Sequence, residues 1–180
     1  DVADEVELEI LIERRVPRVR CGGLGVERLV SRLWPVEAHM DRGDALCAAR
    51  LAQLEMIRAG TTCFADPGSY FSAETAQAVK ESGMRGMIAR TVFDMGQTTM
   101  GDLPKGFFEP TDEALVRADE MVAEFEGALD GRLKAWFSIR VPVAMSDDLL
   151  RRLGKLAEKR GVSASSVTPV RIATRPSPRI

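Results

Sequence analysis

The spacing of hydrophobic residues along the chain changes between a helical period and short, nearly continuous apolar runs. Val26, Leu29 and Leu33 follow a helical period up to Trp34, and Pro35 ends or redirects that helix. Asp41 or Asp44 can cap the next helix. The same reasoning predicts helices over residues 44–57, 72–82, 111–129 and 146–160, and strands over residues 61–65, 87–93 and 133–141.

Apolar strands that alternate with amphipathic helices are typical of a parallel α/β sheet covered on both faces. A right-handed series of such units predicts either a doubly wound sheet or part of a (β/α) barrel. Both folds place their chemistry at the carboxyl ends of the strands, which are expected here at Asp66, Asp94 and Arg140. These three residues are the candidates for binding a substrate. Arg90 lies inside a predicted strand and is expected to pair with an acidic side chain.

The pattern divides the chain into three parts. Residues 1–25 form an irregular N-terminal segment, although Val6, Leu8, Ile10 and Ile12 alternate with acidic residues as in a strand. Residues 26–162 carry the regular α/β pattern. Residues 163–180 are rich in Ser, Thr, Pro and Arg, which predicts a disordered basic tail.

Composition narrows the classes of function. The 180 residues carry 25 basic and 27 acidic side chains, a balance that argues against nucleic-acid binding. No apolar run has the roughly 18 residues of a membrane span, and the acidic N-terminus lacks the basic region of a secretory signal. Three cysteines without a Cys-x-x-Cys pair predict reduced thiols in a cytoplasmic protein. His39 is the single histidine, so this chain alone cannot build a zinc site from two or three histidines.

Several short stretches, taken in order, resemble the amidohydrolase superfamily, and in particular its branch of aminohydrolases, deaminases and chlorohydrolases. The most specific stretch is Gly60-Thr61-Thr62-Cys63-Phe64-Ala65-Asp66. The others are Leu33-Trp34-Pro35-Val36-Glu37-Ala38, Leu54-Glu55-Met56-Ile57-Arg58, Glu81-Ser82-Gly83-Met84-Arg85-Gly86, Asp130-Gly131-Arg132 and Ser146-Asp147-Asp148-Leu149-Leu150. The similarity extends over roughly residues 26–161.

The resemblance implies a metal-dependent hydrolase on a (β/α)8 barrel that acts on a small molecule such as a nucleobase or triazine derivative. Zinc or iron is the expected metal, and it activates the attacking water. The family holds this metal with a His-x-His pair, two further histidines and an aspartate. This chain has no His-x-His, and its 180 residues are fewer than the about 250 of a full barrel. We therefore expect a central fragment, a partial barrel that binds no metal and is inactive alone.

One departure concerns the substrate. Deaminases of this branch carry a Pro-His motif before the Ser-Asp-Asp-Leu-Leu helix, and its histidine contacts the substrate. Arg140 stands at that position here, which is compatible with a more acidic substrate, because guanidinium groups pair with carboxylates and phosphates. The alternative hypothesis is a non-catalytic association module or a degenerate paralogue. Exposed barrel edges would favour self-association in either case.

Overall fold

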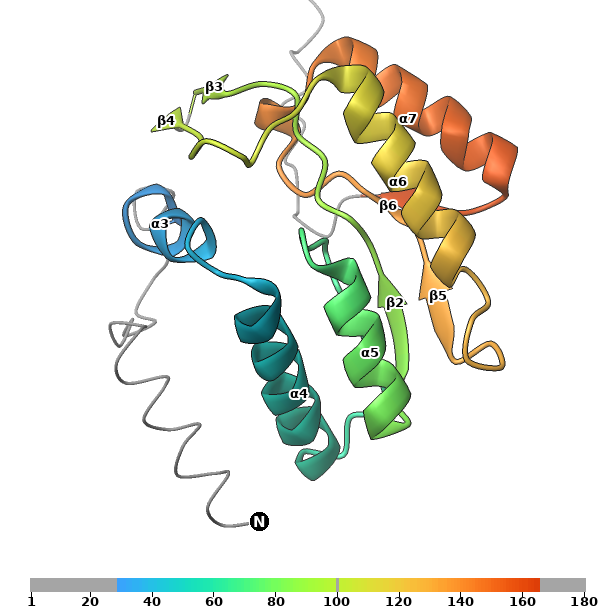
Figure 1. The fold of residues 1–180 in the computed structure, drawn as a ribbon. Coiled ribbons are helices and arrows are strands. Elements are labelled where there is room, and N and C mark those ends of the chain that lie inside the picture. Colours follow the sequence, from blue (N-terminus) through green and yellow to red (C-terminus); the bar gives the residue numbers. More distant parts are fainter. Residues whose placement is uncertain (1–28, 100, 166–180) are drawn as a thin grey trace, which may run out of the picture.

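In the computed structural model, which describes residues 29–99 and 101–165, short parallel strands alternate with helices (Figure 1). Three strands form one sheet in the order β1 (Cys63–Ala65), β2 (Arg85–Ile88) and β5 (Leu133–Ala135). Both pairings are parallel, and Gly86 lies in register with Phe64 on one side and Leu133 on the other. The predicted parallel α/β fold is therefore confirmed for the described residues.

The chain continues this parallel arrangement after β5. The strand β6 (Phe137–Ser138) follows one residue later and pairs in parallel with β7 (Ala164–Ser165). The strand β7 lies inside the segment that was expected to be a disordered tail. The expected boundary after residue 162 is therefore wrong for residues 164 and 165, because the backbone of β6 offers them a pairing edge. Residues 166–180 and the expected N-terminal segment 1–25 lie outside the described residues.

The predicted helices are present, although the helix expected over residues 111–129 already ends at Phe125. They are η1 (Leu29–Leu33), α3 (Trp34–Glu37), α4 (Arg42–Arg58), α5 (Ser72–Ser82), α6 (Thr111–Phe125), η2 (Pro142–Ala144) and α7 (Asp147–Arg160). Asp41 caps α4 and Ser146 caps α7, because their side chains accept hydrogen bonds from the amides of Asp44 and Leu149. Gly83 and Gly161 end α5 and α7 in left-handed conformations. The helix was expected to end or turn at Pro35, but the helical backbone continues from η1 through Leu33 into α3, and Pro35 lies in the first turn of α3.

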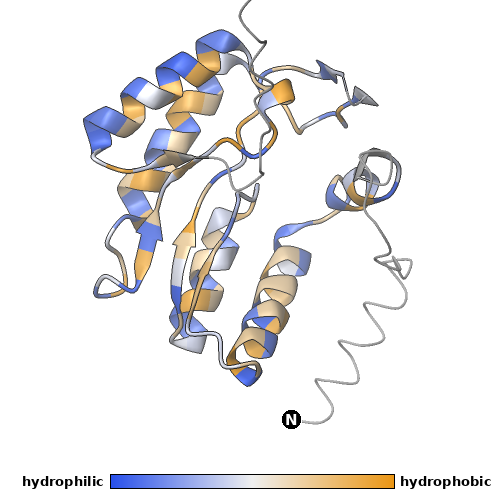
Figure 2. Cartoon of the chain, turned by 180° about the vertical axis from the view of Figure 1, so that it is seen from behind, coloured by the Kyte–Doolittle hydropathy of each residue, from blue (hydrophilic) through white to orange (hydrophobic). Residues whose placement is uncertain are grey.

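The core lies between the sheet and helices α5, α6 and α7. Val79, Ile88, Ala114, Leu149 and Leu153 are completely buried there. Figure 2 shows that hydrophobic and hydrophilic residues alternate along α7, as expected of a helix that buries one face. No helix among the described residues is long and apolar enough to cross a membrane.

The helix α4 does not bury the apolar side chains that its sequence indicates. It buries Ala45 and Gln53, whereas Leu54 and Ile57 remain 47% and 45% exposed. The Gln53 Oε1 atom accepts a hydrogen bond from Ser82 of α5 at 2.6 Å. This side of α4 is held by small and polar contacts with α5, and part of its apolar surface stays uncovered.

The predicted end of the second strand is wrong. The strand expected over residues 87–93 ends at Ile88, so Asp94 is not a strand-end residue. The long loop that follows contains a small antiparallel hairpin of β3 (Gln97–Thr98) and β4 (Gly101–Asp102). This loop buries Leu103 and Phe107, which keeps it packed against the core.

Candidate functional site at the carboxyl ends of the strands

Asp66 occupies the turn that directly follows β1. Its Oδ1 atom accepts a hydrogen bond from the Gly68 amide at 2.9 Å, and its carbonyl oxygen accepts one from Trp136 Nε1 at 3.2 Å. Burial raises the pKa of the Asp66 carboxyl, although the Gly68 amide and the charge of Arg140 act in the opposite direction. The site thus holds a carboxyl group that is protonated more easily than an exposed aspartate.

The turn after Asp66 packs closely on the end of β2. Gly68 has a φ of 121°, and a Cβ atom there would lie 3.1 Å from both the amide nitrogen and Oγ1 of Thr91. Ser69 forms an isolated parallel bridge with Arg90, and the Ser138 hydroxyl donates a hydrogen bond to the Pro67 carbonyl. Glycine is therefore required where the turn meets the neighbouring strand.

Arg140 lies two residues beyond β6 and forms an ion pair with Glu37 of α3. The Nη2 and Oε1 atoms are 2.9 Å apart, and each side chain is 21% exposed. The other carboxylate oxygen of Glu37 is buried and has no hydrogen-bond partner among the described residues. Sequence reasoning missed Glu37 as a site residue, although it stands in the Trp-Pro-x-Glu stretch of the resemblance.

A second pair of charges lies beyond the end of β2. Arg90 Nη2 is 3.3 Å from Glu109 Oε1, and Arg117 of α6 contacts the other oxygen of Glu109 at 2.8 Å. The side chains of Arg90 and Glu109 are mostly buried. The expected pairing of Arg90 with an acidic side chain is confirmed.

Tyr70 lies among these charged residues. Its hydroxyl donates a hydrogen bond to the Phe107 carbonyl at 3.2 Å, and the two rings are 4.9 Å apart between centroids. Burial raises the pKa of the Tyr70 hydroxyl, while Arg140 lowers it and Glu37 raises it further. The electrostatic influence of Arg140 on both Tyr70 and Asp66 places the three side chains in one polar region.

Asp94 differs from Asp66 and Arg140 in its surroundings. Its Oδ1 atom accepts a hydrogen bond from the Ser146 amide at 2.7 Å. Its Oδ2 atom accepts hydrogen bonds from the hydroxyls of Ser146 and Thr111, at 2.5 and 2.8 Å. The Asp94 carboxylate thus connects the N-terminal ends of α6 and α7. These contacts assign Asp94 a structural role, and its contact with a substrate stays a prediction.

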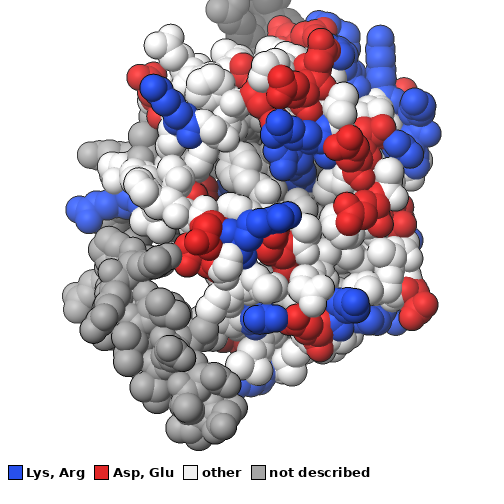
Figure 3. Space-filling view, viewed as in Figure 1, with Lys and Arg blue, Asp and Glu red and all other residues white. Residues whose placement is uncertain are grey.

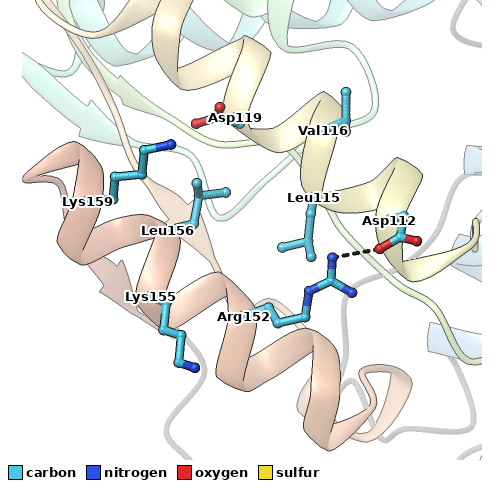
Figure 4. Close-up of a pocket in the computed structure, with 8 residues that line it drawn as sticks. All are labelled: Asp112, Leu115, Val116, Asp119, Arg152, Lys155, Leu156 and Lys159. Carbon is cyan, nitrogen blue, oxygen red and sulfur yellow. Dashed lines mark hydrogen bonds and ion pairs between the residues drawn. The ribbon is translucent and has the colours of Figure 1, made fainter.

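The groove between α6 and α7 is a separate surface feature. Leu115, Val116 and Leu156 form its apolar part, and Arg152 is paired with Asp112 at 2.6 Å along its rim (Figure 4). It lies between two helices and contains none of the residues at the strand ends. Acidic and basic side chains are interspersed over this region, as Figure 3 shows, so the surface has no strong charge of one sign.

The described residues form a parallel α/β arrangement with polar side chains beyond the ends of its strands, as in (β/α) barrels. The sequence profile of the amidohydrolase family matches residues 21–166, and the chain belongs to this family. It is 36% identical over 134 residues to the 5-methylthioadenosine/S-adenosylhomocysteine deaminase of Pelotomaculum thermopropionicum, which covers 74% of this chain and 28% of that protein. It is 34% identical over 137 residues to the 5'-deoxyadenosine deaminase of Methanosarcina mazei, with 75% and 29% covered.

Solved structures show the same fold. A guanine deaminase from C. acetobutylicum with bound guanine superposes with a TM-score of 0.66 at 21% identity, covering 80% of this chain and 35% of that one. An adenosine deaminase from Xanthomonas campestris with bound zinc also gives 0.66 at 24% identity, covering 81% and 31%. The described chain thus forms part of an amidohydrolase barrel, and it spans less than a third of the curated relatives that it matches.

Zinc is bound in the adenosine deaminase and in a variant of the atrazine chlorohydrolase of Arthrobacter aurescens. In this chain no group of three or more His, Cys, Asp or Glu side chains within residues 29–99 and 101–165 could hold a metal ion. His39 is exposed, and its Nδ1 atom lies 2.6 Å from the Pro35 carbonyl oxygen. The described residues therefore do not fit the metal of the family.

Proposed function

We propose that this chain forms part of an amidohydrolase that hydrolyses a C–N bond of a cyclic nitrogen compound, with adenosine derivatives as the first substrate class to test. The names of its deaminase relatives support this class. The observation that carries the proposal is the grouping of Asp66, Glu37 and Arg140 beyond the carboxyl ends of β1 and β6. Barrel enzymes bind their substrates at this end of the strands.

In this proposal Arg140 is the residue that selects the substrate. Its guanidinium is balanced by Glu37 in the present structure, and a carboxylate or phosphate on a substrate would compete with Glu37 for it. The Asp66 carboxyl, with its raised pKa, can donate a hydrogen bond to a ring nitrogen when protonated. Asp94 holds the N-terminal ends of α6 and α7 together.

We expect that this chain alone does not catalyse the reaction. The chain carries one histidine, and the described residues offer no metal-binding group. We expect the purified chain to bind a ligand without converting it. Adenosine, guanine and atrazine incubated with the chain and added zinc should release no ammonia or chloride above the rate without protein. Release by repeated turnover would contradict this part of the proposal.

The role of Arg140 is tested by titrating two adenosine derivatives that differ in charge. We expect adenosine 5'-monophosphate to bind about tenfold more tightly than 5'-deoxyadenosine, because its phosphate can pair with Arg140. The variant Arg140→His should remove this difference, whereas Arg151→His should preserve it, since Arg151 is 61% exposed on α7. Amide chemical shifts near Asp66 and Tyr70 report the binding. Equal affinities in the unmodified chain would contradict the role of Arg140.

A second candidate function is the non-catalytic association module. The exposed side chains of Leu54 and Ile57 on α4 favour it, because such surface is available for a partner. Light scattering after size-exclusion chromatography separates the two candidates. A defined dimer that binds neither adenosine derivative would support the module, and a ligand-binding monomer would support the hydrolase segment.

A further inference from the structure

The strand β1 is paired on one side only among the described residues. Its partner is β2, and β1 is the outermost strand of the three-stranded sheet. The Thr62 carbonyl accepts from the Arg85 amide, and the Asp66 amide donates to the Met87 carbonyl. Because backbone groups alternate along a strand, those of Cys63 and Ala65, between these two residues, point to the opposite edge. This edge can accept another strand.

The two faces of β1 differ in character. The Phe64 ring covers Gly86 and adjoins Val79 of α5, so Phe64 lies on the helix side of the sheet. Cys63 and Ala65 therefore lie on the other side, where both are exposed. A strand added to this edge should place apolar side chains beside Phe64 and polar ones beside Cys63 and Ala65.

The connection into β1 indicates the direction of such a strand. Figure 1 shows α4 running away from α3 alongside α5, and a short connection over residues 59–62 leads from its end into β1. A helix that leads into a parallel strand normally returns from a preceding parallel strand beside it. No preceding strand is present among the described residues, and Leu54 and Ile57 of α4 remain exposed. The position next to β1 is therefore suited to a parallel strand from earlier in the chain.

We propose that residues 6–12 of the same chain add this strand to the open edge of β1. Val6, Leu8, Ile10 and Ile12 alternate with Glu7, Glu9 and Leu11, which gives one apolar and one largely acidic face. These residues lie outside the described part of the chain and outside the family match at residues 21–166, so the proposal goes beyond the proposed function.

The length of the connecting segment and the charge of residues 6–12 both support their pairing with β1. The 16 residues from 13 to 28 can extend over roughly 50 Å, which is ample to connect the end of the strand with η1. The acidic face would lie on the same side of the sheet as Arg85, which is in register with Cys63. Arg85 is exposed and has no ion-pair partner among the described residues.

Hydrogen exchange tests the pairing directly. In the full chain we expect the edge-facing amide of Cys63 or Ala65 that bonds the new strand to exchange about 100-fold more slowly than in an unstructured peptide. The double variant Leu8→Asp/Ile10→Asp should lose this protection, while Glu7→Gln/Glu9→Gln should retain it. The amide of Asp66 reports whether β1 itself is still folded, because it bonds to β2. Rapid exchange of both edge amides in the unmodified chain would overturn the proposal.

Disulfide formation identifies the occupant and its orientation. In a chain with Cys21→Ser and Cys47→Ser, either Glu7→Cys or Glu9→Cys should form an intrachain disulfide with Cys63, since neighbouring strands lie within disulfide distance. Leu8→Cys is the matched control, because its side chain should lie on the other face. Peptide mapping of the oxidised monomer provides the measurement. A disulfide between two copies, equal reaction at position 8, or no disulfide from either position would overturn the proposal.

Discussion

At the scale of the residue, Asp66 shows how the candidate site differs from ordinary surface. Its carboxylate is mostly removed from water and its pKa is raised, so its ionised form is less stable in the folded protein than in the unfolded chain. A neutral amide could make the same turn, because the Gly68 amide needs only an acceptor oxygen. A carboxyl group is thus present where stability alone does not require it, which is common at binding sites.

The variant Asp66→Asn should therefore raise the free energy of unfolding at pH 7. The gain should shrink as the pH falls through the raised pKa of Asp66, because the folded wild-type carboxyl then takes up its proton and the cost of burying its charge disappears. Urea denaturation at several pH values measures this change. Asp102→Asn, at an exposed position of β4, is the control and should have no such effect. A loss of stability at neutral pH would contradict the prediction.

At the scale of the element, the sequence predicted those features that depend on local chemistry. Gly83, Ser146 and Gly161 cap helices as their residue types indicate. The predicted end of β2 was wrong, because the mostly apolar residues 89–93 are largely buried although the regular strand pairing ends at Ile88 and is followed by an isolated bridge at Arg90. Burial by loops and helices gives the same hydrophobic signal as a strand, so periodicity could not locate this boundary.

The contact between α4 and α5 leads to a prediction about acid. Arg50 of α4 donates two hydrogen bonds to Glu81 of α5, at 2.7 and 2.8 Å. This guanidinium lowers the pKa of Glu81 to about 2 from an ordinary value of 4.5, with help from Gln77. Because the folded pKa is the lower one, the stabilisation is present above pH 4.5 and is lost as the pH falls toward 2.

The variant Glu81→Gln should therefore make the free energy of unfolding less dependent on pH between about 4.5 and 2. Urea midpoints measured across this interval test the prediction. Glu113→Gln is the comparison, because Glu113 contacts Arg117 only at 3.4 Å and is 57% exposed. If both variants retained the full wild-type slope, the ion pair would not link the two helices in solution.

At the scale of the whole molecule, the site could be predicted only in part. Asp66 and Arg140 follow from the rule that parallel strands end at one edge, and the structure connects them electrostatically. Glu37 was missed because it lies 103 residues before Arg140, and no local pattern reports a contact over that distance. Asp94 was assigned to the same edge, yet its oxygens contact two helices, since β2 ends six residues earlier.

The contacts of Asp94 join parts of the chain that are 17 and 52 residues away, so its loss should weaken the molecule as a whole. We expect Asp94→Ala to lower the free energy of unfolding by about 2–4 kcal/mol, because it removes hydrogen bonds to a carboxylate and leaves the Ser146 amide without its acceptor. Asp102→Ala should change it by less than about 0.5 kcal/mol. Circular dichroism and tryptophan fluorescence should follow the same unfolding curve in both variants. A neutral effect at position 94 would show that α6 and α7 are held by their apolar contacts alone.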